Sequence, residues 1–368
     1  MKKIFTVLTS IALTFALSFS AAFANDDAFL KSQNYLKTIT LDSPDAVIAY
    51  EATGMEADYK ADALLNNFKE TDYTTASYGD LAKSIIAISL LGENPKDFNN
   101  TNLVEILENR VQEDGTLTND VNGGCGATIW TLMALETVNS SKVKAVADKL
   151  STMAMDNGAY WYEYKGPNAD LDTTGWAMEA LSVAGRSTYE AAISKAYTFV
   201  QSKLNSTDGY YDNWGGNADT QSCVLEGLSV AGYTLDTNAY NYLLSYQNED
   251  GTFNALNYST GQLEPNAYAS VEGARALGVI NNGSFVLRAR RDYTETTTPV
   301  VTEPETPTTP TKPSTTTPAV KPETTTTEPK KETVKVVNTG DNTNVMAYVV
   351  AAIAAVGVIV LVIKSKKK

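Results

Sequence analysis

Acidic side chains recur at matching positions in a repeated segment of this chain. Between Asp170 and Gly185, the side chains of Asp172, Trp176 and Glu179 follow the spacing i, i+4, i+7, which places them on one face of a helix. Clustered carboxylates raise one another's pKa and can then exchange protons near neutral pH. The pattern would permit acid–base chemistry. The alternative is that these carboxylates are structural acceptors for the backbone of neighbouring loops.

The segment that carries them returns at a fixed interval of about 47 residues, which is typical of a repeat architecture. Glu226 and Glu272 occupy the position of Glu179 in the two later copies. The copies end at a Gly or Asn, as helices often do. We expect these inner helices over residues 42–54, 79–92, 125–139, 170–185, 217–232 and 264–278.

Each copy follows another stretch with helical periodicity. These outer helices are expected over residues 27–39, 56–70, 102–111, 141–155, 188–204 and 237–246. No convincing alternating run indicates a strand. The sequence therefore predicts an all-α domain over residues 25–292, with six helix pairs closed into a ring.

Short turns containing Asp-Gly or Asn-Gly join the outer helices to the inner ones, and aromatic residues follow several of them. These aromatic side chains either fill the gaps between helix pairs or form a rim on which sugars or planar ligands stack. Together with two tryptophans of the polar face, they are the candidate ligand-binding residues: Trp130, Trp176, Tyr160, Trp161, Tyr211 and Trp214.

These turns resemble the QW-type repeats of the terpene cyclase and protein prenyltransferase superfamily, and the Ala-Leu-x-x-Gly ends of the inner helices fit the same pattern. The resemblance covers about 250 residues and implies an (α/α)6 toroid. That fold serves cyclases, prenyltransferases, thioester domains and cobalamin carriers. The resemblance therefore indicates a fold and leaves the function open.

Each family chemistry needs particular residues. The run from Asp170 to Thr173 resembles the Asp-x-Asp-Asp motif of class II terpene cyclases, which would make Asp172 the acid that protonates an alkene. Alternatively Asp172 caps a helix, since Asp219 stands at the same place in the next copy. Gly124-Cys125-Gly126 resembles the start of a thioester motif, but Thr128 cannot supply the acyl group.

The composition of the chain further narrows the possible functions. The chain contains 29 Lys and Arg, 43 Asp and Glu and no His, for a net charge of −14. The acidic balance argues against a nucleic-acid partner. The absence of histidine excludes Ser-His-Asp catalysis and His-ligated zinc. No calcium or phosphate-binding loop is present, so we expect no metal and no cofactor. Cys125 and Cys223 lie in non-neighbouring copies, and we expect no disulfide.

Both ends of the chain carry targeting features. Residues 1–24 read as a secretory signal, with a charged start, an apolar run and Ala22-Phe23-Ala24. Residues 293–335 are rich in Thr and Pro and predict a disordered stalk. In residues 336–368, Thr339 and Gly340 precede an apolar run over 345–363 and a basic tail, which resembles a Gram-positive sortase signal. The run is long enough to cross a membrane.

We therefore expect an exported protein on the cell surface, anchored to the membrane by its C-terminal helix or to peptidoglycan by sortase. The leading functional prediction is binding of a small molecule, glycan or surface protein, in the lumen of the ring or on its aromatic rim. One alternative is an extracellular enzyme of the terpene cyclase-like or glycan-active class, using Asp172 and the glutamates. Another is an adhesion or structural surface module.

Overall fold

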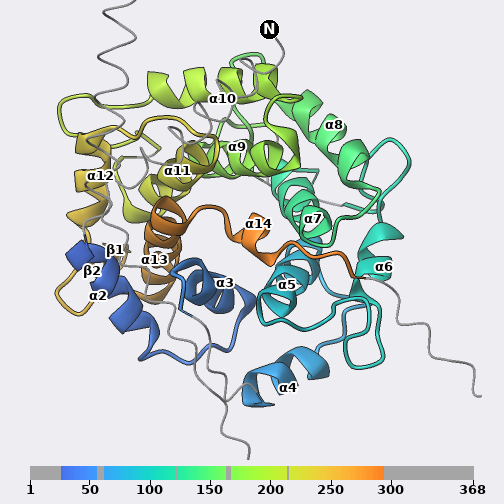
Figure 1. Ribbon diagram of the computed structural model, residues 1–368. Coiled ribbons are helices and arrows are strands. Elements are labelled where there is room, and N and C mark those ends of the chain that lie inside the picture. Colours follow the sequence, from blue (N-terminus) through green and yellow to red (C-terminus); the bar gives the residue numbers. More distant parts are fainter. Residues whose placement is uncertain (1–25, 56–61, 121–122, 163–166, 214, 294–368) are drawn as a thin grey trace, which may run out of the picture. The chain divides into compact units, whose positions relative to one another are not determined.

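The computed structural model describes residues 26–55, 62–120, 123–162, 167–213 and 215–293 (Figure 1). Several predicted features lie outside these residues: the predicted signal segment, the predicted stalk beyond Tyr293, the predicted sorting residues Thr339 and Gly340, the apolar run over 345–363, and Trp214. Among the described residues, no helix is long and apolar enough to cross a membrane.

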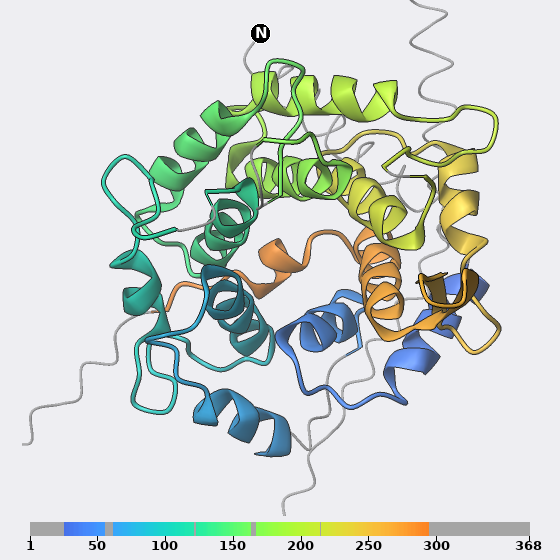
Figure 2. The same ribbon diagram turned by 180° about the vertical axis from the view of Figure 1, so that it is seen from behind.

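The described residues are mostly helical, as the sequence predicts. Six helices pack side by side in closed succession, and the last of them also packs on the first (Figures 1 and 2). In chain order they are α3 (Pro44–Ala52), α5 (Tyr78–Leu90), α7 (Cys125–Thr137), α9 (Leu171–Gly185), α11 (Ala218–Val230) and α13 (Ala267–Asn282). They correspond to the six predicted copies, with boundaries that shift by a few residues.

A second set of helices lies outside this inner group, and most of them pack on the inner helices beside them (Figure 2). In chain order they are α2 (Asp26–Leu36), α4 (Asp62–Glu70), α6 (Leu103–Glu108), α8 (Val143–Met153), α10 (Glu190–Ser202) and α12 (Thr237–Leu244). Each lies within a stretch for which the sequence predicts an outer helix, except that α2 begins one residue before its predicted stretch. Inner helix α13 packs against α2, so residues from the two ends of the described chain lie together.

Five of the six inner helices begin at a polar side-chain cap, and α7 begins at Gly124 without one. The side chains of Asp170, Asn217 and Asn266 each accept a hydrogen bond from a backbone N–H in the first turn of the helix that follows. Such a bond satisfies one of the donors that a helix start leaves unpaired. Asp172 therefore does not cap α9, because Asp170 does. Asp172 and Asp219 instead lie within the first turns of α9 and α11.

Helices α9 and α11 approach each other more closely than side chains would permit. A Cβ atom on Gly227 would overlap the carbonyl oxygen of Gly175, and one on Gly175 would overlap the carbonyl of Cys223. The glycines thus allow backbone-to-backbone contact at the centre of this pair. This close packing fixes the spacing of the two helices that carry Glu179 and Glu226.

The turn glycines hold each helix pair against the next outer helix. Gly251 has a φ of +85°, and a Cβ atom there would overlap the backbone carbonyl of Lys31 in α2. The last turn of the repeat therefore packs on the first described helix. Turn glycines of the same kind pack in this way on Ala145, Lys195 and Asn238 of the successive outer helices: Gly115, Gly158 and Gly209.

Two elements differ from the sequence-based expectation. A hairpin of β1 (Phe253–Asn257) and β2 (Gln262–Asn266) precedes α13, whereas we expected no strand and a helix from residue 264. Pro265 pairs with Asn254 in this hairpin, and the Asn266 cap starts the helix only at Ala267. The short helix α14 (Phe285–Ala289) was not predicted. It returns to the middle of the inner helices (Figure 1) and buries Phe285.

Candidate functional site

The repeated glutamates meet in the interior of the inner helices. Glu179, Glu226 and Glu272 project from α9, α11 and α13, and all three are buried. The Ser284 hydroxyl, just before α14, donates a hydrogen bond of 3.2 Å to Glu179 Oε1. The three carboxyl groups are thus part of a packed centre, and the prediction that they could carry out acid–base chemistry stays untested.

Arg275 supplies the counter-charge for this group. Its Nε lies 3.0 Å from Glu226 Oε2, and its Nη2 lies 3.8 Å from Glu272 Oε1. Among the side chains that the structure describes, it is the only buried lysine or arginine. Sequence reasoning missed Arg275, although the alignment of copies contains a signal: the equivalent positions are the small residues Ser182 and Ser229.

One guanidinium cannot neutralise three buried carboxylates, and the pKa values of Glu179 and Glu272 reflect this. Burial raises the pKa of Glu272 to about 8, although Arg275 opposes the shift. Burial and the charge of Glu226 raise the pKa of Glu179. Glu179 also shares a hydrogen bond with Glu226, which requires a proton between the two carboxyl groups. Glu272 therefore holds a proton at neutral pH, and the raised pKa of Glu179 favours its protonated form.

Asp172 is a separate titrating group near the start of α9. Burial, followed by the charge of Asp170, raises its pKa to about 7, while hydrogen bonds from Thr220 and Asn213 act in the opposite direction. The Asn213 amide donates to Asp172 Oδ1 over 3.3 Å. A carboxyl group with this pKa can donate or accept a proton near neutral pH.

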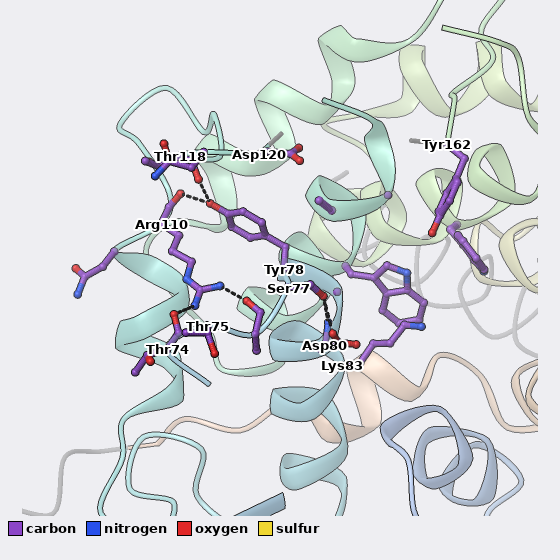
Figure 3. Close-up of a pocket in the computed structure, with 18 of the residues that line it drawn as sticks. Thr74, Thr75, Ser77, Tyr78, Asp80, Lys83, Arg110, Thr118, Asp120 and Tyr162 are labelled. Atoms are coloured by element: carbon purple, nitrogen blue, oxygen red, sulfur yellow. Dashed lines mark hydrogen bonds between the residues drawn. The ribbon is translucent and has the colours of Figure 1, made fainter. Parts of the chain in front are cut away.

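A cavity of about 680 Å³ opens near the amino-terminal ends of several inner helices (Figure 3). Trp130 and Trp176, both predicted ligand-binding residues, line it. Their rings meet edge to face with centres 5.8 Å apart, and most of each ring is buried. The Lys83 ammonium lies 4.6 Å from the centre of the Trp130 ring and 2.8 Å from Asp45 Oδ1. These residues form a rigid apolar wall with one paired cation.

Two tyrosines that sequence reasoning did not select present open ring surfaces to the cavity. Tyr162 is 54% exposed and Tyr268 is 56% exposed, and both line it. The Tyr268 hydroxyl hydrogen-bonds the buried Glu272, which anchors one end of the ring while its surface stays open. Tyr268 could have been found from the sequence by its size, because the other late copies have the small residues Gly175 and Ser222 at this position.

Polar side chains on the opposite side of the cavity are held by hydrogen bonds (Figure 3). The Tyr78 hydroxyl lies 2.6 Å from the carbonyl oxygen of Thr118. The Arg110 guanidinium donates to the carbonyl oxygens of Tyr73, Thr74 and Ala76. Arg110 thus shapes the loop before α5 and is already engaged by backbone acceptors. The polar residues that line the cavity around this loop are Thr74, Thr75, Ser77, Asp80, Asn109, Thr118, Asn119 and Asp120.

The remaining predicted residues lie apart from this cavity. Tyr160 and Tyr211 are fully buried between helix pairs, where their backbone N–H groups donate to the side chains of Thr174 and Gln221. They occupy the gap-filling position that was the alternative to a ligand rim. Asp172 lies one turn before Trp176 but does not line the cavity.

The cysteine, aspartate and glutamate side chains that the structure describes form no metal centre. Cys125 and Cys223 are buried free thiols, and Cys223 Sγ lies 3.9 Å from Glu272 Oε2. Within the described part of the chain, no group of three Cys, Asp or Glu side chains is arranged to hold a metal ion. Comparison with known proteins gives no relative, since no protein-family model and no curated protein matches the chain.

Proposed function

We propose that this chain is a surface-anchored binding protein of the (α/α)6 toroid class, and that it binds a carbohydrate in the cavity between Tyr162 and Tyr268. The closed succession of inner helices and the surrounding outer helices support the toroid class. The signal-like segment 1–24 and the apolar run over 345–363 support export and anchoring.

The observation that carries the proposal is the pair of open tyrosine rings beside a cavity of about 680 Å³. This volume falls within the range of small-ligand pockets. The apolar face of a sugar ring packs well on an aromatic face, and its hydroxyls need many neutral donors and acceptors. The threonine, serine and asparagine side chains around the cavity meet that need.

The cations at the cavity are already engaged, which disfavours an anionic ligand. Lys83 is paired with Asp45, and Arg110 is held by three backbone carbonyl groups. An anionic ligand would have to compete with these partners. A sugar needs only the hydroxyl and amide groups, together with the tyrosine rings.

A glycan array with the purified protein tests the proposal. We expect binding to a restricted set of glycans, and we expect Tyr268→Ala to weaken it at least about tenfold, or about 1.4 kcal/mol. Tyr258→Ala is the matched control, because Tyr258 is 93% exposed and does not line the cavity. Equal loss in both variants, or unchanged binding by Tyr268→Ala, would overturn the proposal and favour an adhesion surface elsewhere.

A second candidate function is acid–base catalysis on a glycan or isoprenoid, and it rests on Asp172. Its pKa of about 7 is suited to a general acid. Incubation of the protein with bound glycans, followed by mass spectrometry of the products, tests this function. Product formation that Asp172→Asn abolishes would make the protein an enzyme, while ligand recovered unchanged would support binding alone.

A further inference from the structure

A second cavity adjoins the first. It has a volume of about 300 Å³ and contains Trp161, Thr128 and Lys149 in its lining. Asp120 lines both cavities, so the two meet at this residue. The volume of the second cavity lies at the small end of the range for independent ligand pockets.

Consecutive aromatic residues serve the two cavities. Trp161 lines the second cavity and Tyr162 lines the first. Neighbouring side chains of an extended segment point to opposite sides. The segment is held in place, because Tyr160 forms a β-bridge with Asp170 and the Trp161 carbonyl accepts a hydrogen bond of 3.0 Å from the Cys125 N–H. One anchored segment therefore presents an aromatic ring to each cavity.

We infer that the two cavities are successive subsites for one linear carbohydrate chain, so that the ligand class is an oligosaccharide or polysaccharide. This inference rests on the proposed function. One sugar unit packs on Tyr162 and Tyr268, and the next packs on Trp161. Lys149 and Thr128 line the second subsite, and their side chains can hydrogen-bond the hydroxyls of the sugar ring bound there.

The position of Asp120 fits this arrangement. A carboxylate has several acceptor sites. The Asp120 carboxylate can therefore accept a hydrogen bond from a hydroxyl of each of two neighbouring sugar units, even where one of its acceptor sites is already engaged. A chain that spans both subsites gains the second contact without a second loss of translational freedom. Affinity should therefore depend on chain length.

Isothermal titration of the whole protein tests the inference. The ligands are chains of one to six units of a glycan that binds in the array. We expect affinity to rise at least about tenfold once the chain is long enough to occupy both subsites. Trp161→Ala should remove this gain, and it should reduce the affinity for long chains more than that for a single unit. Lys149→Ala changes a half-buried side chain on α8 and should reduce the same gain, which guards against misfolding of the tryptophan variant.

The outcomes separate the inference from the proposed function. Binding with the same affinity at every chain length, or equal loss by Trp161→Ala for short and long chains, would overturn the two-subsite inference alone. Absence of binding at every length would overturn both.

Discussion

The Nε atom of Arg275 lies 3.0 Å from Glu226 Oε2, and both side chains are only 1% exposed. This ion pair joins α13 to α11 in the interior of the inner helices. Glu272 and Glu179 lie beside it, and burial raises the pKa of both carboxyl groups, since the single guanidinium is occupied by Glu226. The repeated polar face thus contributes to the stability of the fold at its centre and supports Tyr268 at its edge.

Removal of the cation should be costly. In Arg275→Met the buried Glu226 loses its partner, and we expect a loss of about 3–5 kcal/mol in the free energy of unfolding. Urea denaturation measures it. The double variant Arg275→Met with Glu226→Gln should recover much of the loss, because no unpaired charge remains. A loss below about 1 kcal/mol in the single variant would show that the pair is not buried in solution.

Stability should fall as the pH rises from about 5 to about 8. The pKa of Glu272 is about 8 in the folded chain against an ordinary value of 4.5, so the folded state holds a proton that the unfolded state has released. Asp172, with a pKa of about 7, acts in the same direction. The loss is on the order of a few kcal/mol, since one pKa unit corresponds to about 1.4 kcal/mol.

Chemical denaturation at a series of pH values measures this dependence. Glu272→Gln should flatten the curve, because the glutamine cannot release a proton. Glu249→Gln is the control, since the Glu249 side chain is 95% exposed. Stability that rises over the same interval would contradict the assignment of protons to the buried carboxyl groups.

The close contact between α9 and α11 predicts that substitution of Gly227 lowers the stability of the fold. Gly227→Ala places a methyl group against the carbonyl oxygen of Gly175, and the helices must separate. Overpacking of this kind costs about 1–3 kcal/mol or more, which thermal unfolding detects. Gly79→Ala, in α5, is the matched control, because its nearest contact would be the Ser77 hydroxyl at 3.8 Å. Equal stability of the two variants would be incompatible with the close approach.

The two cysteines should be unreactive in the folded protein. Burial raises the pKa of the Cys125 thiol to about 12 and raises that of Cys223 as well, which suppresses the reactive thiolate. We expect a thiol reagent to label neither cysteine without denaturant and to label both after unfolding in the absence of a reductant. Detection of fewer thiols after unfolding would instead indicate a disulfide.

The helices were predictable from sequence because their signals are local. Caps such as Asn217 and terminal glycines such as Gly232 mark the copies within a few residues. The hairpin was not predictable in this way. The strand from Gln262 to Asn266 contains Pro265 and is mostly exposed, so it has no alternating apolar pattern.

The candidate site was only partly predictable, because only some of its residues follow the repeat. Comparison of the copies identified Trp130, Trp176 and the glutamates, which share one helix face. It gave no information on α14, whose contact from Ser284 to Glu179 joins residues 105 positions apart. Tyr268 and Arg275 depart from the repeat. The residues that depart from the repeat, more than those that conform to it, distinguish the cavity and the buried centre.

The most direct test of carbohydrate binding is a crystal structure of the protein with an array-positive oligosaccharide. We expect one sugar ring packed on Tyr162 and Tyr268, within the cavity bounded by Trp130 and Trp176, and the next ring beside Trp161. An oligosaccharide bound on the outer helices, with the cavity filled only by water, would contradict the proposed function.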